Sequence, residues 1–212
     1  MDFNVPKVIL DKIKELDEFI EREIKPLERK NLQFFDHRRE HARTDWENGG
    51  TPTKEWEALL QEMKKRADAA GHLRFALPKE IGGQNGSNLS MAMIREHFAH
   101  KGLGLHNDLQ NESSIVGNFP LVHMMWQFGT DAQKEEFLPA LITGSRRIGF
   151  GLTERNHGSD ATYMETTAVK LGDEWVINGN KRFNSGIHDA THDLVFARTS
   201  GEPGEGMGIT AF

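Results

Sequence analysis

A short segment of the chain, residues 150–160, contains the side chains best suited to chemistry. It reads Phe-Gly-Leu-Thr-Glu-Arg-Asn-His-Gly-Ser-Asp, and it supplies the hydroxyl groups of Thr153 and Ser159 together with backbone amides that glycine leaves accessible. Such a loop can hydrogen-bond the polar edge of a ring at one end and a phosphate at the other. Residue types alone leave an ordinary polar turn between strands as an equally good explanation.

A second cluster lies at residues 181–186, with the sequence Lys-Arg-Phe-Asn-Ser-Gly. In a strand, Phe183 and Ser185 would point to the same side, because side chains alternate between the two faces. An aromatic face beside a hydroxyl could stack on a flat heteroaromatic ligand and hydrogen-bond to it. The same pattern occurs in many ordinary strands, so by itself it is weak evidence for a site.

Other chemistries find little support in the 212 residues. The chain has no cysteine, which excludes disulfides, thiol nucleophiles and iron–sulfur clusters. The histidine pairs His37/His41 and His97/His100 lack a third ligand at the spacing of a metal site, so we expect no bound metal. A net charge of −6 argues against nucleic-acid binding, and no Gly-x-Ser-x-Gly motif indicates a serine hydrolase.

The first part of the chain has the periodicity of helices. Steps of three and four between apolar residues predict helices over residues 5–27, about 51–70, 89–100, 113–128 and 130–143. Pro26 is expected to end or kink the first helix near Lys25, and Pro120 to break the fourth. Thr130 begins a capping-box pattern at the start of the fifth.

After Arg146 the pattern changes to that of strands. Short alternating or β-branched runs predict strands at 166–171, 174–178 and 193–198, with a further strand under way at 207–212. We therefore predict an α+β fold, in which an all-α helical domain (1–145) is followed by an antiparallel β domain (146–212). The β domain is expected to be incomplete, because it is short for an independent sheet and halts inside a strand pattern.

Four motifs resemble those of the acyl-CoA dehydrogenase family, in the family's order and spacing. They are Leu-Pro-Lys-Glu-Ile-Gly-Gly at 77–83, Phe-Gly-Thr-Asp-Ala-Gln-Lys-Glu-Glu-Phe-Leu-Pro at 128–139, Leu-Thr-Glu through Gly-Ser-Asp at 152–160, and Trp-Val-Ile-Asn-Gly-Asn-Lys at 175–181. The resemblance covers nearly the whole chain. It implies the family's N-terminal helical domain and the first part of its flavin-binding middle β domain.

The resemblance also implies a set of residues that bind FAD: Phe150, Leu152, Thr153, Gly158, Ser159, Phe183 and Ser185. The first three would line the flavin ring, with the Thr153 hydroxyl bonding its pyrimidine side. Gly158 and Ser159 would contact the pyrophosphate. Ser159 would also touch the CoA part of the substrate.

Two positions depart from the family pattern. Phe183 stands where the family usually has tryptophan beside the flavin, which keeps the stacking face but loses an N–H group. Ser185, two residues on, takes the hydroxyl position expected to face the flavin N5 region. Arg155 replaces the usual proline of the 152–160 loop, which frees the backbone φ angle and adds a charge near the phosphates. Neither change prevents flavin binding on physical grounds.

The implied activity is that of an FAD-dependent oxidoreductase acting on CH–CH bonds, which converts an acyl-CoA to the trans-2-enoyl-CoA. The implied partners are the acyl-CoA substrate, an electron-transfer flavoprotein as electron acceptor, and further copies of the chain in a homodimer or homotetramer. The family's catalytic glutamate lies in a C-terminal helical domain outside these 212 residues, so no catalytic residue is assigned. Glu154 belongs to the flavin loop and is not the base. We therefore expect the 212 residues alone to be inactive.

Two other interpretations remain open at this point. One is a sister flavoenzyme on the same scaffold: an acyl-CoA oxidase, a nitroalkane oxidase or a flavin monooxygenase. The other is a truncated, non-catalytic interaction module. No apolar run is long enough to span a bilayer, and the N-terminus lacks the features of a secretion signal, so a cytoplasmic protein without a membrane span is expected.

Overall fold

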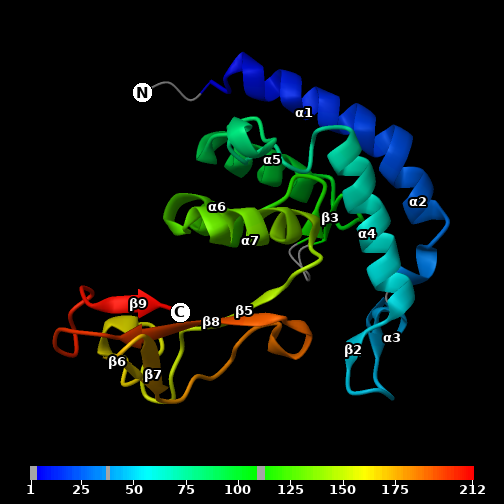
Figure 1. The fold of residues 1–212 in the computed structure, drawn as a ribbon. Helices are drawn as coiled ribbons and strands as arrows, with labels where there is room; N and C mark the ends of the chain where they lie inside the picture. The colour runs from blue at the N-terminus through cyan, green and yellow to red at the C-terminus, as the bar shows by residue number, and fades with distance from the viewer. Residues whose placement is uncertain (1–3, 37–38, 109–112) are drawn as a thin grey trace. The chain divides into compact units, whose positions relative to one another are not determined.

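The computed structural model describes residues 4–36, 39–108 and 113–212, so His37 of the histidine pairs lies outside the described residues. The chain divides into two compact units, Met1–His123 and Met124–Phe212 (Figure 1). The first unit is mainly helical and the second contains the main sheet. The predicted α+β fold class is confirmed. No helix in the described part of the chain is both long and apolar enough to cross a membrane.

The first unit is built on α1 (Lys7–Phe19), α2 (Lys25–Arg29), α3 (Arg39–Arg43), α4 (Lys54–Ala69) and α5 (Asn88–His100). The apolar stripes of α1, α4 and α5 meet in one core, as their spacing requires. Its fully buried members include Leu16, Ile20, Ile24, Trp56, Met63, Ile94 and Phe98.

Pro26 was expected to end or kink the first helix near Lys25; the regular α-helix is interrupted directly before Lys25, but the helical course does not end there. The chain stays helical to Arg29, with Pro26 in the first turn of α2. Between α1 and α2 lies a π-helical turn, Ile20–Ile24, in which the Lys25 N–H donates to the Ile20 carbonyl. A proline has no N–H to donate to the preceding turn, and widening that turn to the π form accommodates it without a break.

Two further helices follow, and one starts later than the sequence predicted. The helix expected from residue 113 begins only at Pro120, as α6 (Pro120–Phe128), because proline suits the first turn of a helix rather than its interior. The last helix, α7 (Asp131–Thr143), has the predicted capping box: Thr130 accepts from the Gln133 N–H, and the Gln133 side chain accepts from the Thr130 N–H.

The helical part also contains two very short antiparallel ladders that the sequence analysis missed. They are β1 (Thr44–Asp45) with β2 (Thr51–Pro52), and β3 (Asn107–Asp108) with β4 (Ser113–Ser114). Because Thr51 and Pro52 belong to β2, the cap of α4 is Thr53, whose hydroxyl accepts from the Trp56 N–H. Strands of two residues are too short for an alternating pattern to reveal them.

The second unit holds a five-stranded sheet of β5 (Ile148–Gly151), β6 (Thr167–Leu171), β7 (Glu174–Asn178), β8 (His192–Arg198) and β9 (Ile209–Ala211). The order is β5-β8-β6-β7, with β9 also paired to β8 (Figure 1). The β6–β7 hairpin and the β8–β9 pair are antiparallel, as predicted. The sheet is nevertheless mixed, because β5 pairs with β8 in parallel after the long connection between them.

Candidate functional site

The seven residues that the sequence analysis selected all lie in the second unit. Phe150 is on β5, and Leu152 and Thr153 follow directly in the 152–160 loop. Phe183 and Ser185 belong to the 181–186 segment between β7 and β8. Phe150 packs its ring against Phe196 of β8, with ring centroids 5.1 Å apart, yet remains 43% exposed. An aromatic face is therefore accessible at the end of β5.

Backbone and side-chain hydrogen bonds join the 152–160 loop to the 181–186 segment. The Arg182 N–H donates to the Thr153 carbonyl at 2.9 Å. The ammonium group of Lys181 donates to the Leu152 carbonyl at 3.1 Å. The two clusters, about thirty residues apart in sequence, are thus bonded to each other, which neither motif alone could indicate.

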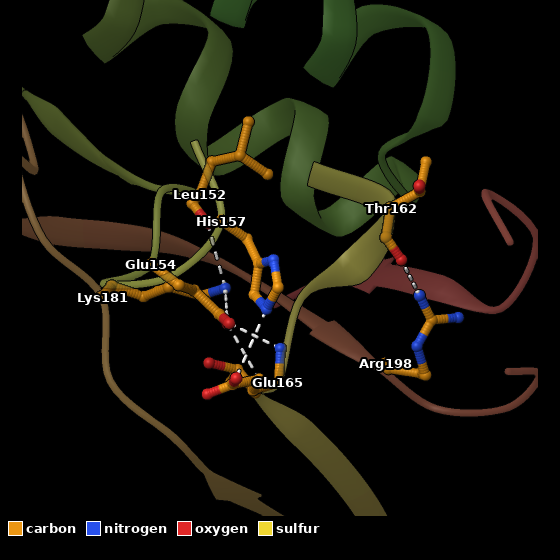
Figure 2. A network of polar contacts seen from close by, with 8 residues as sticks. Leu152, Glu154, His157, Thr162, Glu165, Lys181 and Arg198 are labelled. Carbon is orange, nitrogen blue, oxygen red and sulfur yellow. Dashed lines mark hydrogen bonds and ion pairs between the residues drawn. The ribbon is translucent and has the colours of Figure 1, made fainter. Parts of the chain in front are cut away.

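A buried ion pair between Glu154 and Lys181 anchors the loop (Figure 2). The carboxylate and ammonium groups lie 2.8 Å apart, and the two side chains are only 4% and 7% exposed. Glu154 also accepts hydrogen bonds from the N–H groups of Glu165 and Thr166, at 2.5 and 2.9 Å. The loop is therefore tied at its start to the beginning of β6 and to the 181–186 segment.

The charge state of Glu154 fits this anchoring role. Burial by itself would raise the pKa of its carboxyl group, but the hydrogen bonds from Lys181, Thr166 and Glu165 outweigh that effect and lower the pKa to about 2. A carboxylate this weakly basic is a poor proton acceptor at neutral pH. Glu154 and Lys181 belong to two separate sequence motifs, and only the fold shows that they pair.

The tip of the loop is open. A Cβ atom placed on Gly158 would meet no atom within 4 Å, and the backbone N–H groups of Gly158 and Ser159 donate to no acceptor in the described residues. The hydroxyl groups of Thr153, Ser159 and Ser185 likewise have no partner in that part of the chain, and both serines are exposed. Free amides around a bare glycine suit an anionic oxygen, so the residues fit a phosphate-containing cofactor.

The 181–186 segment differs from the prediction. It is not a strand, so Phe183 and Ser185 do not share a face through strand alternation. Phe183 has a φ of +60°, in the left-handed region that a bulky side chain rarely occupies, and its ring is 76% exposed. Its aromatic face is accessible through this unusual backbone, with the Arg182 guanidinium 4.6 Å from the ring centroid.

A second set of contacts involves the middle of the loop and the turn at Ala161–Tyr163 that follows it (Figure 2). His157 and Asn156 both bond the Glu165 carboxylate, at 3.3 and 3.2 Å. The buried guanidinium of Arg198, on β8, donates to the carbonyls of Thr162 and Glu205. Its acceptors are neutral carbonyls, which suits a residue that fixes a loop rather than one that binds a charged ligand.

A polar cavity of about 960 Å³ lies beside the loop. Its lining includes Arg155, the residue that replaces proline, together with Asn156, Asn180 and Arg182. Arg155 and Arg182 are exposed, so positive charge is available at this side of the loop. Among the described residues, no three His, Asp or Glu side chains gather closely enough to hold a metal ion.

Comparison with known proteins identifies the family. A family model described as the acyl-CoA dehydrogenase N-terminal domain matches residues 13–145, and one described as the acyl-CoA dehydrogenase middle domain matches residues 149–212. The chain belongs to the acyl-CoA dehydrogenase family. Members of the family are FAD-dependent oxidoreductases.

Individual relatives agree with this assignment. The short-chain specific acyl-CoA dehydrogenase of Megasphaera elsdenii is 32% identical over 216 aligned positions, covering 100% of this chain and 49% of the relative. The caffeyl-CoA reductase–Etf complex subunit CarC of Acetobacterium woodii is 34% identical over 152 residues, covering 72% and 38%. The chain thus spans half or less of the length of these relatives.

Among solved structures, the butyryl-CoA dehydrogenase of Megasphaera elsdenii matches with a TM-score of 0.57 and 28% identity. The match covers 100% of this chain and 49% of that structure. The fold of the whole chain is therefore similar to about half of a solved butyryl-CoA dehydrogenase structure.

Proposed function

We propose that this acyl-CoA dehydrogenase binds FAD at the 152–160 loop and the 181–186 segment, and that the whole protein dehydrogenates an acyl-CoA to the trans-2-enoyl-CoA. The observation that carries the proposal is the open loop tip at Gly158, with free amide and hydroxyl groups on a loop that the Glu154–Lys181 pair holds in place. Such fixed donors suit the binding of a charged cofactor, because they need little rearrangement on binding.

In this proposal each selected residue has a defined part. Phe150 and Leu152 contact the flavin ring, and the Thr153 hydroxyl bonds its polar edge. Gly158 and Ser159 bind the pyrophosphate through their N–H groups, and Ser159 also touches the CoA part of the substrate. Phe183 offers an aromatic face to the flavin, and Ser185 a hydroxyl to its N5 side. The exposure of Phe150, Phe183, Ser159 and Ser185 supports these roles.

Bound FAD supplies the hydride acceptor, and the chain's residues hold it in position. We assign no catalytic base to these 212 residues, and the low pKa of Glu154 supports leaving that residue out. We also propose that residues 1–145 form the helical domain and residues 146–212 the first part of the middle domain. The assembly we propose is a homodimer or homotetramer, with an electron-transfer flavoprotein as electron acceptor; the Etf complex named for the CarC relative supports that acceptor.

The activity can be tested by anaerobic titration of the protein, expressed from its own gene and loaded with FAD, with saturated acyl-CoA thioesters. We expect loss of the absorbance of the oxidised flavin as it accepts the hydride. A flavin that no acyl-CoA bleaches would refute the proposal. Subsequent exposure to oxygen separates a dehydrogenase, which reoxidises slowly, from an oxidase, which reoxidises rapidly.

A second candidate is the opposite direction, reduction of an enoyl- or arylacrylyl-CoA, because the CarC relative is named a caffeyl-CoA reductase. The same residues would serve, since the two directions share one set of reacting atoms. Mixing the chemically reduced protein with an arylacrylyl-CoA distinguishes the two cases. Faster oxidation by the unsaturated thioester than reduction by the saturated one favours the reductase.

A further inference from the structure

One polar pair near the proposed site has no part in the function described above. The Asn184 side-chain amide donates to a carboxylate oxygen of Asp193 at 2.7 Å. Asn184 lies between Phe183 and Ser185 in the 181–186 segment, whereas Asp193 is on β8, next to β5. The bond therefore attaches the segment that carries two proposed flavin contacts to the central strand of the sheet.

The neighbouring strand leaves space for this pair. Gly149 and Gly151 of β5 lie under it: a Cβ atom on Gly151 would be 3.1 Å from the Asn184 amide nitrogen and 3.2 Å from the Asp193 carboxylate. A Cβ on Gly149 would be 2.9 Å from the other Asp193 oxygen. Side chains at these two positions would press on the pair, so its place depends on bare backbone in β5.

The pair is not an efficient source of stability. The remaining side-chain oxygens of Asn184 and Asp193 are both buried without a hydrogen-bond partner in the described residues. Burying an acceptor without a partner is unfavourable, so part of the gain from the single hydrogen bond is lost. The orientation of the amide is nevertheless fixed, because a carboxylate can only accept from its N–H group.

The adjacent backbone needs such an attachment. Phe183 has a φ of +60°, which is strained for a bulky side chain and persists only where surrounding contacts impose it. On one side the Arg182 N–H bonds the Thr153 carbonyl, and on the other Asn184 bonds Asp193. The Asn184 carbonyl also accepts from the Ile187 N–H at 3.2 Å, which closes the turn after Ser185.

We propose that Asn184 and Asp193 are positioning residues, which hold Phe183 in its left-handed conformation and so set the places of the Phe183 ring and the Ser185 hydroxyl against the flavin. This inference rests on the proposed function for its flavin-binding part. The attachment of the segment itself stands on the contacts alone, and can be measured without any cofactor.

The test uses the protein expressed from its own gene and two disruptive variants, Asn184→Leu and Asn184→Ala. If one of these variants does not fold, the other can still be measured. Asp193→Asn is the conservative variant, because its amide oxygen can still accept from Asn184. Thr210→Val is the matched control: it removes the 3.0 Å bond between the Thr199 and Thr210 hydroxyls in the same sheet, away from the segment.

The first readout is amide hydrogen exchange of residues 183–190 in cofactor-free protein. We expect about ten-fold faster exchange in the Asn184 variants and no local change in Asp193→Asn or Thr210→Val. The second readout is FAD affinity together with the position of the flavin absorption bands. We expect about ten-fold weaker binding and shifted bands in the Asn184 variants, whereas Asp193→Asn should keep the wild-type affinity and band positions.

Unchanged exchange in folded Asn184 variants would overturn the proposal, because the pair would then not hold the segment. Faster exchange with unchanged FAD affinity and spectrum would overturn it too, since the segment would not position the flavin. Equally fast exchange and equally weak FAD binding in Thr210→Val would show that any loss of stability has this effect. That result would also count against the proposal. Failure of the wild-type protein to bind FAD is a separate result that refutes the proposed function itself.

Discussion

Replacing Glu154 by glutamine should destabilise the fold far more than an ordinary charge removal. The wild-type carboxylate uses one oxygen to accept from Lys181 and the Thr166 N–H, and the other to accept from the Glu165 N–H. Glutamine has a single acceptor oxygen, so its NH₂ group would face a donor. The buried ammonium of Lys181 would also lose its counter-charge.

The size of the effect follows from the pKa of Glu154. A fall from the ordinary 4.5 to about 2 corresponds to about 3 kcal/mol of stability at neutral pH. Loss of one partner from a buried pair costs a similar amount, about 3–5 kcal/mol. Because the folded pKa lies below the unfolded value, this stability is complete above pH 4.5 and is lost as the pH falls towards 2.

Urea unfolding of wild type and Glu154→Gln at several pH values measures this directly. We expect a difference of about 3 kcal/mol at pH 7 that shrinks as the pH approaches 2. Glu136→Gln is the control, since Glu136 is 56% exposed and pairs with Arg146 at the surface, where a pair contributes less than about 1 kcal/mol. A Glu154→Gln effect no larger than that of Glu136→Gln, or one independent of pH, would show that the Glu154–Lys181 pair does not stabilise the fold as its geometry predicts.

Three further predictions concern other parts of the chain. Gly158→Ala should leave the free energy of unfolding unchanged, because the added Cβ would meet no atom within 4 Å. It should weaken FAD binding about ten-fold in an equilibrium titration, and equal affinity would contradict the proposed pyrophosphate contact. Gly83→Ala should destabilise by about 3 kcal/mol in urea unfolding, because its Cβ would lie 1.9 Å from the Leu77 carbonyl oxygen; a neutral result would show that this loop rearranges freely. Burial and the charge of Lys12 lower the pKa of His72 to about 4, so protonation of His72 favours the unfolded state. The free energy of unfolding should therefore fall as the pH drops from 6.5 to 4, and it should fall much less in His72→Gln. Parallel pH profiles of the two proteins would argue against a neutral buried histidine.

Much of the architecture could be predicted from the sequence because strong local signals agreed. The capping residues Thr130 and Gln133, the apolar spacing of α1 and α4, and the hairpin pattern of β6 and β7 each act over a few residues. The capping box, the buried helix faces and the antiparallel hairpin that they predict are all present in the structure. The parallel pairing of β5 with β8 could not be predicted, because it joins segments about forty residues apart and no local pattern encodes which strands become neighbours.

The candidate site shows the same division. The order of the motifs was enough to select Thr153 and Phe183. It did not show that hydrogen bonds from Arg182 and Lys181 join the two segments that carry them. The strand predicted around Phe183 was wrong: the residue has a left-handed backbone, which a bulky side chain rarely adopts and which residue types do not indicate. Long-range contacts of this kind leave no signal in residue spacing.

We propose above all that the 152–160 loop and the 181–186 segment form an FAD site. Equilibrium titration of the folded protein, expressed from its own gene, with FAD tests it most directly, followed through the flavin absorbance and fluorescence. We predict saturable binding of one FAD per chain, with an altered flavin spectrum and weaker binding in Gly158→Ala. A well-folded wild-type protein that leaves FAD free in solution would contradict the account.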